Sequence, residues 1–226
     1  MTTGKAIILL SGGLDSATVL GMVLDAGKEC HAVAFDYGQR HKRELGSAVR
    51  VVDHYRTRYP ALRALSVIGI SGLGLSSSAL TSDIAVPTGT PEGEIPVTYV
   101  PARNSVFLAI GTAIAEATGA DEVHTGFNAV DYSGYPDCRE EYARAMERAL
   151  ALGTKRGIEG NPIRVVTPII RWSKEDIVRK ALRIGVPLKH TWSCYAGLPE
   201  PCGVCDSCVI RARAFAVVGA EDPSRV

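Results

Sequence analysis

Blocks of apolar residues alternate along the chain with polar stretches, in an order that predicts strands and helices in turn. Residues 6–10 (Ala-Ile-Ile-Leu-Leu) form an apolar run with the length and β-branching of a buried parallel strand. Residues 17–24 follow with the apolar density of a helix that packs on a sheet. Strands that alternate with helices predict an α/β fold, a parallel sheet with helices on both faces. Further strands are predicted at 30–36, 65–70, 122–127 and 164–166, and further helices at 44–58, 105–118, 140–152 and 173–185.

Composition limits the size of the fold and the class of partner. With 226 residues, of which 46% are hydrophobic and 22% charged, the chain has enough material for one packed core and a small appendage. A net charge of +1, from 25 basic and 24 acidic residues, gives no support to a large nucleic-acid surface. No apolar run approaches 18 residues, and the N-terminal segment is predicted as a strand rather than a signal peptide. We therefore expect a soluble, cytoplasmic protein with no membrane contact.

The hexapeptide Ser11-Gly12-Gly13-Leu14-Asp15-Ser16 lies on the turn between the first strand and the first helix. Its two glycines allow a tight bend and leave backbone N–H groups uncovered. Two serine hydroxyls and the positive end of the helix dipole add to these donors, so the turn predicts a site for an anion such as phosphate. The alternative is that the glycines only make a tight turn. The order of residues differs from the G-x-x-x-x-G-K-[ST] phosphate loop.

Other polar residues stand where parallel strands end or helices begin. Asp36, Tyr37 and Gln39 follow the second strand, and in open α/β sheets ligands gather at that edge. They are candidates for nucleotide contact, or alternatively a polar cap on the next helix. Arg103 and Lys174 stand at helix starts, where the dipole disfavours a cation. Each is predicted to have an anionic partner, unless it is a plain surface arginine or a lysine directed into water.

Residues 128–139 place two carboxylates, an amide and two tyrosines in one loop after the fourth predicted strand. Aromatic rings stack on flat rings, carboxylates accept from ring N–H groups and amides do both. The loop is therefore a candidate for recognition of a flat, hydrogen-bonding heterocycle, although its composition is also that of ordinary turns.

Four of the six cysteines lie between positions 194 and 208. Cys202, Cys205 and Cys208 repeat as C-x-x-C-x-x-C, and Cys194 precedes them across a loop rich in proline and glycine. Without a secretory signal, this clustering favours metal binding over disulfides. Four thiolates in one local segment predict a closed, structural zinc site. An iron–sulfur cluster has a similar spacing and is the alternative, and free cysteines are the third.

The hexapeptide resembles the SGGxDS pyrophosphate loop of the adenine-nucleotide α-hydrolases, which split ATP between its α and β phosphates. Along nearly its whole length, the chain is similar to one branch of that superfamily, the 7-cyano-7-deazaguanine synthase family. One departure is Ala102, where the family is expected to carry glycine. The segments that carry the resemblance are 11–16, 35–41, 100–104, 128–138 and 191–195, with the cysteines at 202–208.

The resemblance implies a Rossmann-like (HUP-type) nucleotide-binding domain over residues 1–188, with a zinc-binding segment, residues 189–226, packed on it. The implied reaction uses ATP and Mg²⁺ to adenylate the carboxylate of 7-carboxy-7-deazaguanine, which ammonia converts to an amide and a second adenylation to the nitrile, a queuosine precursor. Residue 2 is threonine rather than a glutaminase cysteine, so free ammonium is the expected nitrogen donor. A homodimer is the expected assembly.

Roles are expected for residues from the resemblance together with their positions in the sequence, and the roles of Arg103, Lys174, Asp131 and Asp137 rest on position. Asp15, Arg103 and Lys174 are the expected catalytic residues, with Asp15 acting through Mg²⁺. The expected ATP contacts are Leu10, Ser11, Gly12, Gly13, Leu14, Asp15, Ser16, Ala17, Thr18, Asp36, Tyr37 and Gln39. The expected substrate contacts are Arg103, Asn128, Asp131, Tyr135 and Asp137, and the expected zinc ligands are Cys194, Cys202, Cys205 and Cys208.

Three other functions compete with this one. A paralogous ligase of the same superfamily would adenylate another substrate. A tRNA sulfur transferase would need an RNA surface and usually a catalytic cysteine pair near the nucleotide, which the neutral charge and the closed-looking cluster disfavour. A zinc-dependent nucleic-acid-binding module would leave the phosphate loop unexplained and predicts salt-sensitive binding.

Overall fold

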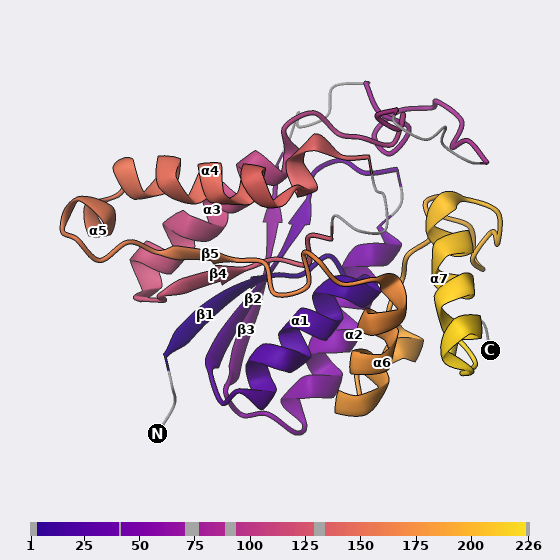
Figure 1. Cartoon of the computed structure of the whole chain (residues 1–226), viewed down its shortest axis with the longest axis horizontal. Helices are drawn as coiled ribbons and strands as arrows, with labels where there is room; N and C mark the ends of the chain where they lie inside the picture. The colour runs from indigo at the N-terminus through magenta and orange to yellow at the C-terminus, as the bar shows by residue number, and fades with distance from the viewer. Residues whose placement is uncertain (1–3, 41, 71–76, 89–93, 129–133, 225–226) are drawn as a thin grey trace.

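The structure is a computed structural model that describes residues 4–40, 42–70, 77–88, 94–128 and 134–224. Its centre is a five-stranded sheet in which every neighbouring pair is parallel, with the strand order β3-β2-β1-β4-β5 (Figure 1). The strands are β1 (Lys5–Leu9), β2 (Glu29–Asp36), β3 (Leu62–Gly69), β4 (Glu122–His124) and β5 (Arg164–Val166). The predicted parallel sheet is confirmed.

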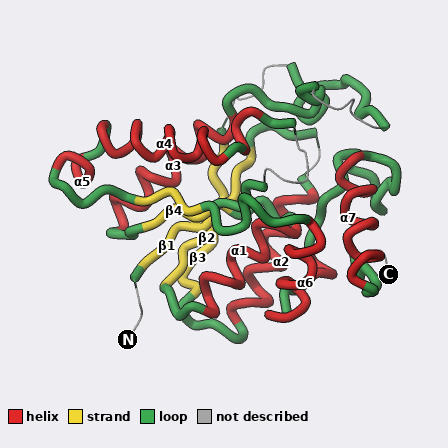
Figure 2. Tube along the Cα trace, in the orientation of Figure 1, coloured by secondary structure: helices red, strands yellow, loops and turns green. Residues whose placement is uncertain are grey.

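Helices cover both faces of the sheet (Figure 2). Helices α1, α2 and α6 pack on one face, with α7 against α6, and α3 and α4 pack on the other. The bounds are α1 (Leu14–Asp25), α2 (Arg43–Arg56), α3 (Arg103–Thr118), α4 (Glu140–Leu152), α5 (Lys155–Ile158), α6 (Lys174–Ile184) and α7 (Asp206–Val218), with short 3₁₀ turns at Pro136–Cys138 and Leu188–His190.

Strand β1 is apolar after Lys5 because both of its faces are covered there. Ile8 and Leu10 belong to the core on the α1 side, and Ile7 and Leu9 belong to the core on the α3 side. Successive side chains of a strand point to opposite faces, so a strand covered on both sides has no polar face. This explains why the sequence shows a continuous apolar run there rather than an alternating one.

Helix α6 begins and ends where the sequence predicts. Ser173 accepts a hydrogen bond from the Asp176 N–H, and the Asp176 carboxylate accepts one from the Ser173 N–H, which completes a capping box. Gly185 ends the helix at φ 69°. These caps fix the position of Lys174 in the first turn, from which its side chain reaches Asp15 at the start of α1.

Strand β4 is shorter than predicted. It ends at His124, and residues 125–128 turn out of the sheet, although the Thr125 N–H still donates to the Val166 carbonyl. Strand β3 begins at Leu62, three residues before the predicted start. Both differences lie at strand ends. After β4 the apolar pattern continues into the loop, and at β3 it begins after the strand has started.

Ala102 has a left-handed backbone, with φ 52° and ψ 18°, and is the one non-glycine residue with positive φ in the described part of the chain. That conformation costs an L-residue about 1–2 kcal/mol, a cost that glycine avoids. Ala102→Gly is therefore expected to raise the free energy of unfolding by about 0.5–1 kcal/mol, measured by urea denaturation.

Gly119 is the matched control for this prediction, because it ends the same helix at φ 71° with no atom within 4 Å of an added Cβ. Gly119→Ala imposes the strain that Ala102→Gly removes, so it should lower the free energy of unfolding by a similar amount. A loss of stability in Ala102→Gly would contradict the strain argument.

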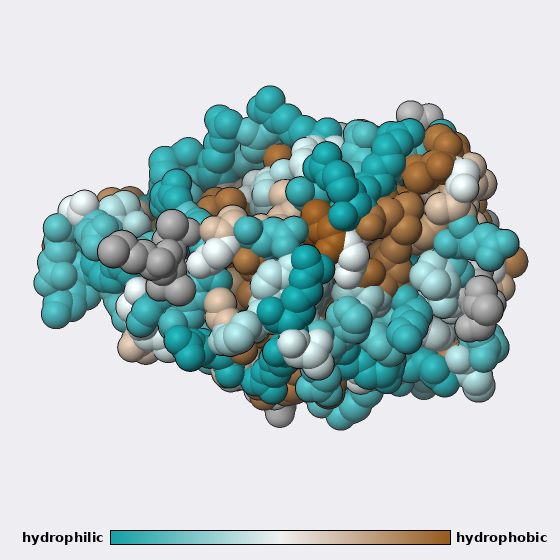
Figure 3. All heavy atoms as spheres, turned by 90° about the horizontal axis from the view of Figure 1, so that it is seen from below, coloured by the Kyte–Doolittle hydropathy of each residue, from teal (hydrophilic) through white to brown (hydrophobic). Residues whose placement is uncertain are grey.

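Polar side chains cover most of the face that Figure 3 presents, and apolar atoms gather in a band across its right half. Within the described residues, no helix has the length and apolar character needed to cross a membrane.

Candidate active site

A cavity of about 300 Å³ opens at the carboxyl ends of β1, β2 and β4. Its walls come from the Ser11–Ser16 loop, the starts of α2 and α3, the residues after β4 and the C-terminal segment. This is the edge of an open α/β sheet where ligands bind, and the volume is in the range of small-molecule sites. The predicted ATP residues in the lining are Leu10, Ser11, Gly13, Leu14, Asp15, Ser16, Tyr37 and Gln39.

The hexapeptide forms a compact cradle at the N-terminus of α1. The Ser11 and Ser16 hydroxyls lie 3.0 Å apart. The Ser11 N–H donates to Ser16 Oγ at 3.2 Å, and the Gly13 N–H donates to Ser11 Oγ at 3.2 Å. Hydroxyls and backbone donors thus converge where the helix dipole is positive, an arrangement that fits a phosphate group.

Gly12 supports this cradle from behind and does not line the cavity. It has φ 87°, and an added Cβ would lie 2.3 Å from the Glu44 carbonyl oxygen and 2.7 Å from the Ala48 nitrogen. The first glycine of the loop is therefore required by the close approach of α2, whereas Gly13 faces the cavity.

Lys174 and Asp15 form an ion pair in the cavity wall. Lys174 Nζ lies 2.8 Å and 3.0 Å from the two carboxylate oxygens of Asp15, and both residues line the cavity. The Lys174 side chain is 15% exposed, so it is not directed into bulk water as one interpretation of the sequence allowed. Its position beside the cradle suits a phosphate ligand as well as Asp15.

Arg103, the first residue of α3, is held among aromatic rings. Its Nη1 donates to the Tyr37 hydroxyl at 3.3 Å, and its guanidinium lies 5.7–5.9 Å from the ring centres of Tyr37, Phe107 and Tyr135. Its buried Nε has no hydrogen-bond partner in the described part of the chain. Burial lowers the pKa of Arg103, but Tyr37 and Tyr135 outweigh it and the pKa lies above its usual value. Arg103 is thus a fixed cation with a free donor.

The predicted substrate residues are placed differently from one another. Asn128 and Tyr135 line the cavity. The Asn128 amide also donates to the Ile169 and Trp172 carbonyls, at 3.1 Å and 2.5 Å, so it ties the loop after β4 to the loop before α6. Asp131 lies outside the described residues.

Asp137 is buried behind the cavity and does not line it. Its Oδ2 accepts the Asn104 N–H at 3.1 Å at the start of α3, and its buried Oδ1 has no partner among the described residues. Burial raises the pKa of this carboxyl. In this position the Asp137 carboxylate stabilises the start of α3 through its hydrogen bond with Asn104.

Four predicted ATP residues lie outside the lining: Gly12, Ala17, Thr18 and Asp36. Ala17 and Thr18 are fully buried in α1, where the Thr18 hydroxyl donates to the Leu14 carbonyl at 2.8 Å. Asp36 forms an ion pair with Lys42 at 2.6 Å. Gln39 lines the cavity but also holds its own turn, because its side chain accepts from the Tyr37 N–H at 2.8 Å.

Sequence reasoning missed two parts of the wall. One is Glu44 in the first turn of α2, and the other is the segment around Trp192, Ser193 and Tyr195 with the start of α7. The Trp192 N–H donates to the Gly12 carbonyl at 3.0 Å, so the C-terminal segment is fastened to the phosphate cradle. Neither part stands directly after a strand or places a cation at a helix start, the two signals by which the other residues were found.

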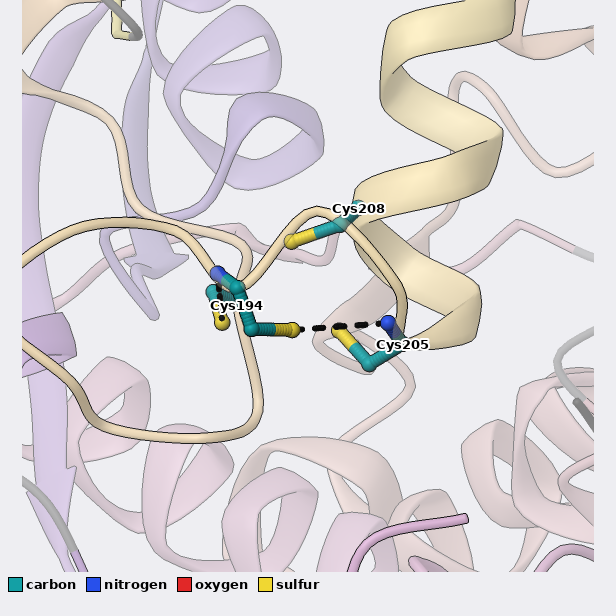
Figure 4. A group of neighbouring side chains, drawn as sticks. Cys194, Cys205 and Cys208 are labelled. Atoms are coloured by element: carbon teal, nitrogen blue, oxygen red, sulfur yellow. Dashed lines mark hydrogen bonds between the residues drawn. The ribbon is translucent and has the colours of Figure 1, made fainter. Parts of the chain in front are cut away.

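The four clustered cysteines meet beside this wall, at the start of α7 (Figure 4). Their sulfur atoms all lie within 4.8 Å of one another. A zinc–sulfur bond of about 2.3 Å spaces tetrahedral ligands about 3.8 Å apart, so a small contraction would place one ion among all four. A hydrogen bond from Cys208 lowers the pKa of Cys205 to about 5, toward the thiolate that binds metals. The donor set therefore fits a metal ion.

Comparison with known proteins identifies the family. The family model described as "Queuosine biosynthesis protein QueC" matches residues 5–219. The chain belongs to the QueC family. QueC relatives align over nearly the whole chain: proteins called 7-cyano-7-deazaguanine synthase from Thermoplasma acidophilum (48% identity, 99% of this chain and 92% of the relative), Nostoc punctiforme (49%, 97% and 98%) and Stutzerimonas stutzeri (50%, 100% and 99%).

Solved structures share the fold of this QueC chain at low sequence identity. A 4-thiouridine synthetase in complex with RNA and ATP aligns with 96% of this chain and 50% of its own, with a TM-score of 0.57 and 21% identity. NMN synthetase from Francisella tularensis aligns with 97% of this chain and 79% of its own, with a TM-score of 0.51 and 14% identity. At these identities the likeness establishes the fold alone.

Proposed function

We propose that the chain is an ATP-dependent 7-cyano-7-deazaguanine synthase, which converts 7-carboxy-7-deazaguanine and ammonia to the nitrile for queuosine biosynthesis. The observation that carries the proposal is its QueC membership, with end-to-end relatives of that name. The cavity supports it independently, because it combines a phosphate cradle, two cations and a set of aromatic rings.

Carboxylate activation is the chemical problem that such a site has to solve. A carboxylate is a poor electrophile because oxide is a poor leaving group. Attack of its oxygen on the α-phosphorus of ATP releases pyrophosphate and leaves AMP as the leaving group. Ammonia then forms the amide as AMP departs. The amide oxygen attacks a second ATP, and loss of AMP and protons gives the nitrile.

The residues of the chain bind and orient the reactants in these steps. Ser11, Gly13 and Ser16 would hold phosphate oxygens through hydroxyl and N–H donors at the start of α1. Lys174 would exchange Asp15 for phosphate, which releases the Asp15 carboxylate to bind Mg²⁺. Mg²⁺ would supply charge neutralisation on the leaving pyrophosphate.

The aromatic part of the cavity suits the deazapurine. Tyr37, Phe107 and Tyr135 surround the Arg103 guanidinium and line the cavity, where a flat ligand ring would contact aromatic side chains. The fixed charge of Arg103 would stabilise negative charge that develops on an acyl or phosphate oxygen. Arg103 thus serves both the substrate and the transition state.

We further propose that Cys194, Cys202, Cys205 and Cys208 hold zinc in a structural role. The sulfur positions and the thiolate character of Cys205 support this assignment over free cysteines. The division at residues 188 and 189, the homodimer, the absence of nucleic-acid partners and the cytoplasmic location stay predictions from the sequence.

The proposal is tested by incubating the metal-loaded protein with ATP, Mg²⁺, ammonium and 7-carboxy-7-deazaguanine, with pyrophosphate release and product mass both measured. The nitrile together with AMP is the expected result. Pyrophosphate release without the nitrile would assign the chain to the adenylation of another substrate. Neither signal from folded protein would overturn the proposal.

A further inference from the structure

Three acidic residues line the cavity, and they differ in how they are paired. Asp15 pairs with Lys174, and Asp206 has an interaction of its own. Glu44 makes no hydrogen bond or ion pair through its side chain with any part of the chain that the structure describes. A carboxylate that faces an enclosed site without a partner is available to accept hydrogen bonds from a ligand.

Glu44 lines the same cavity as Tyr37, Arg103 and Tyr195. The positive charge of Arg103 on α3 acts on it, and its own negative charge acts on Tyr37 after β2 and Tyr195 in the C-terminal segment. Burial raises the pKa of Glu44, a partly exposed side chain. Donors supplied by a ligand would replace the hydration that burial removes.

The geometry of a carboxylate selects a particular kind of ligand edge. Its two oxygens accept a pair of parallel N–H groups, and such charge-assisted pairs are about twice as strong as neutral ones. The 2-amino-4-oxopyrimidine edge of a deazaguanine offers this pair, from its ring N–H and its exocyclic amino group. Asp137, which the sequence suggested for this edge, does not line the cavity, and its Oδ2 accepts the Asn104 N–H at the start of α3.

We propose that Glu44 recognises the N–H and amino edge of the deazapurine and so determines specificity against bases that lack the amino group. This inference rests on the proposed function, because it concerns the substrate of the same site. It assigns the start of α2 to substrate selection.

The experiment compares 7-carboxy-7-deazaguanine with its 2-deamino analogue, 7-carboxy-7-deazahypoxanthine, by isothermal titration calorimetry. The unmodified protein should bind the amino compound about 10- to 100-fold more tightly, the value of a charge-assisted pair. Glu44→Gln should reduce that preference to about threefold or less, because an amide presents one acceptor and one donor. Glu44→Asp keeps the charge and should retain part of the preference.

Two controls distinguish a loss of base specificity from a general loss of ligand binding. ATP affinity should stay within about twofold in Glu44→Gln, because the Glu44 side chain takes no part in the hydrogen bonds of the phosphate cradle. Glu141→Gln removes an exposed carboxylate on α4, whose side chain is 72% exposed, and should leave both ligands unaffected.

The possible results separate this inference from the proposed function. If the unmodified protein neither binds nor converts 7-carboxy-7-deazaguanine, both fail together. If it binds and converts that compound but Glu44→Gln keeps the full preference, or loses ATP affinity in parallel, the role of Glu44 alone is overturned. Should Glu44→Gln fail to fold, a full preference retained in Glu44→Asp at reduced affinity for both ligands would overturn it as well.

Discussion

Lys174→Met is expected to lower kcat/KM for pyrophosphate release by roughly 10²–10³-fold, the usual effect of removing one charge that stabilises a transition state. The half-buried ammonium lies beside the phosphate cradle at 2.8 Å from Asp15, so its loss removes a cation from the phosphates and leaves the carboxylate unpaired. Steady-state kinetics with ATP, ammonium and 7-carboxy-7-deazaguanine measures the effect. Lys174→Arg, which keeps the charge, should recover part of the rate.

Lys180→Met is the matched control, since Lys180 belongs to the same helix and does not line the cavity. Its rate should stay within about twofold of that of the unmodified protein. A Lys174→Met protein that keeps full kcat/KM would show that Lys174 serves only to hold Asp15.

Cys205→Ser is expected to have the largest effect on stability. Loss of one thiolate from a four-cysteine site should release the metal and lower the free energy of unfolding by about 4 kcal/mol, which lowers Tm by about 10 °C in a chain of this size. The segment that the cluster folds contributes Trp192, Ser193 and Tyr195 to the cavity and binds Gly12 through a backbone hydrogen bond. ATP affinity should therefore fall at least about tenfold with it.

Elemental analysis, differential scanning calorimetry and ATP titration test this prediction together. Cys30→Ala is the control, because Cys30 lies in the core of β2 and burial raises the pKa of its thiol to about 12, far from a metal-binding thiolate. It should keep the metal and the ATP affinity while losing some packing energy. Full metal content and an unchanged Tm in Cys205→Ser would mean that Cys205 is not a ligand of the bound ion.

The order of strands and helices was predictable because each element carries a strong local signal. Apolar runs bounded by glycine or polar turns marked β1 and β2, and the Ser173 cap marked α6 to the residue. Strand ends were less certain, as at β4, because apolar residues such as Phe127 also continue into the wall of the cavity.

The site was predictable only where its residues follow a strand or open a helix. Ser11, Asp15 and Arg103 were found in this way and line the cavity. Glu44 was missed because it lies inside a helix start that looks like any acidic first turn. Asp36 was predicted to contact ATP because it ends β2. In the structure it forms an ion pair with Lys42 and does not line the cavity. Whether Glu44 and Asp36 reach the cavity depends on the direction of their side chains and on their partners in the folded protein. The local sequence pattern does not predict either.

The two sides of the cavity come from opposite ends of the chain, and this sets the order in which the enzyme is made. Asp15 and its partner Lys174 are 159 residues apart, and the Trp192 wall that fastens to Gly12 is still further along. During translation the phosphate cradle emerges early. It contacts Lys174 and Trp192 only later, because contacts between distant residues form after the later residue is synthesised. A nascent chain can therefore complete the cavity only after the segment around Trp192 has left the ribosome.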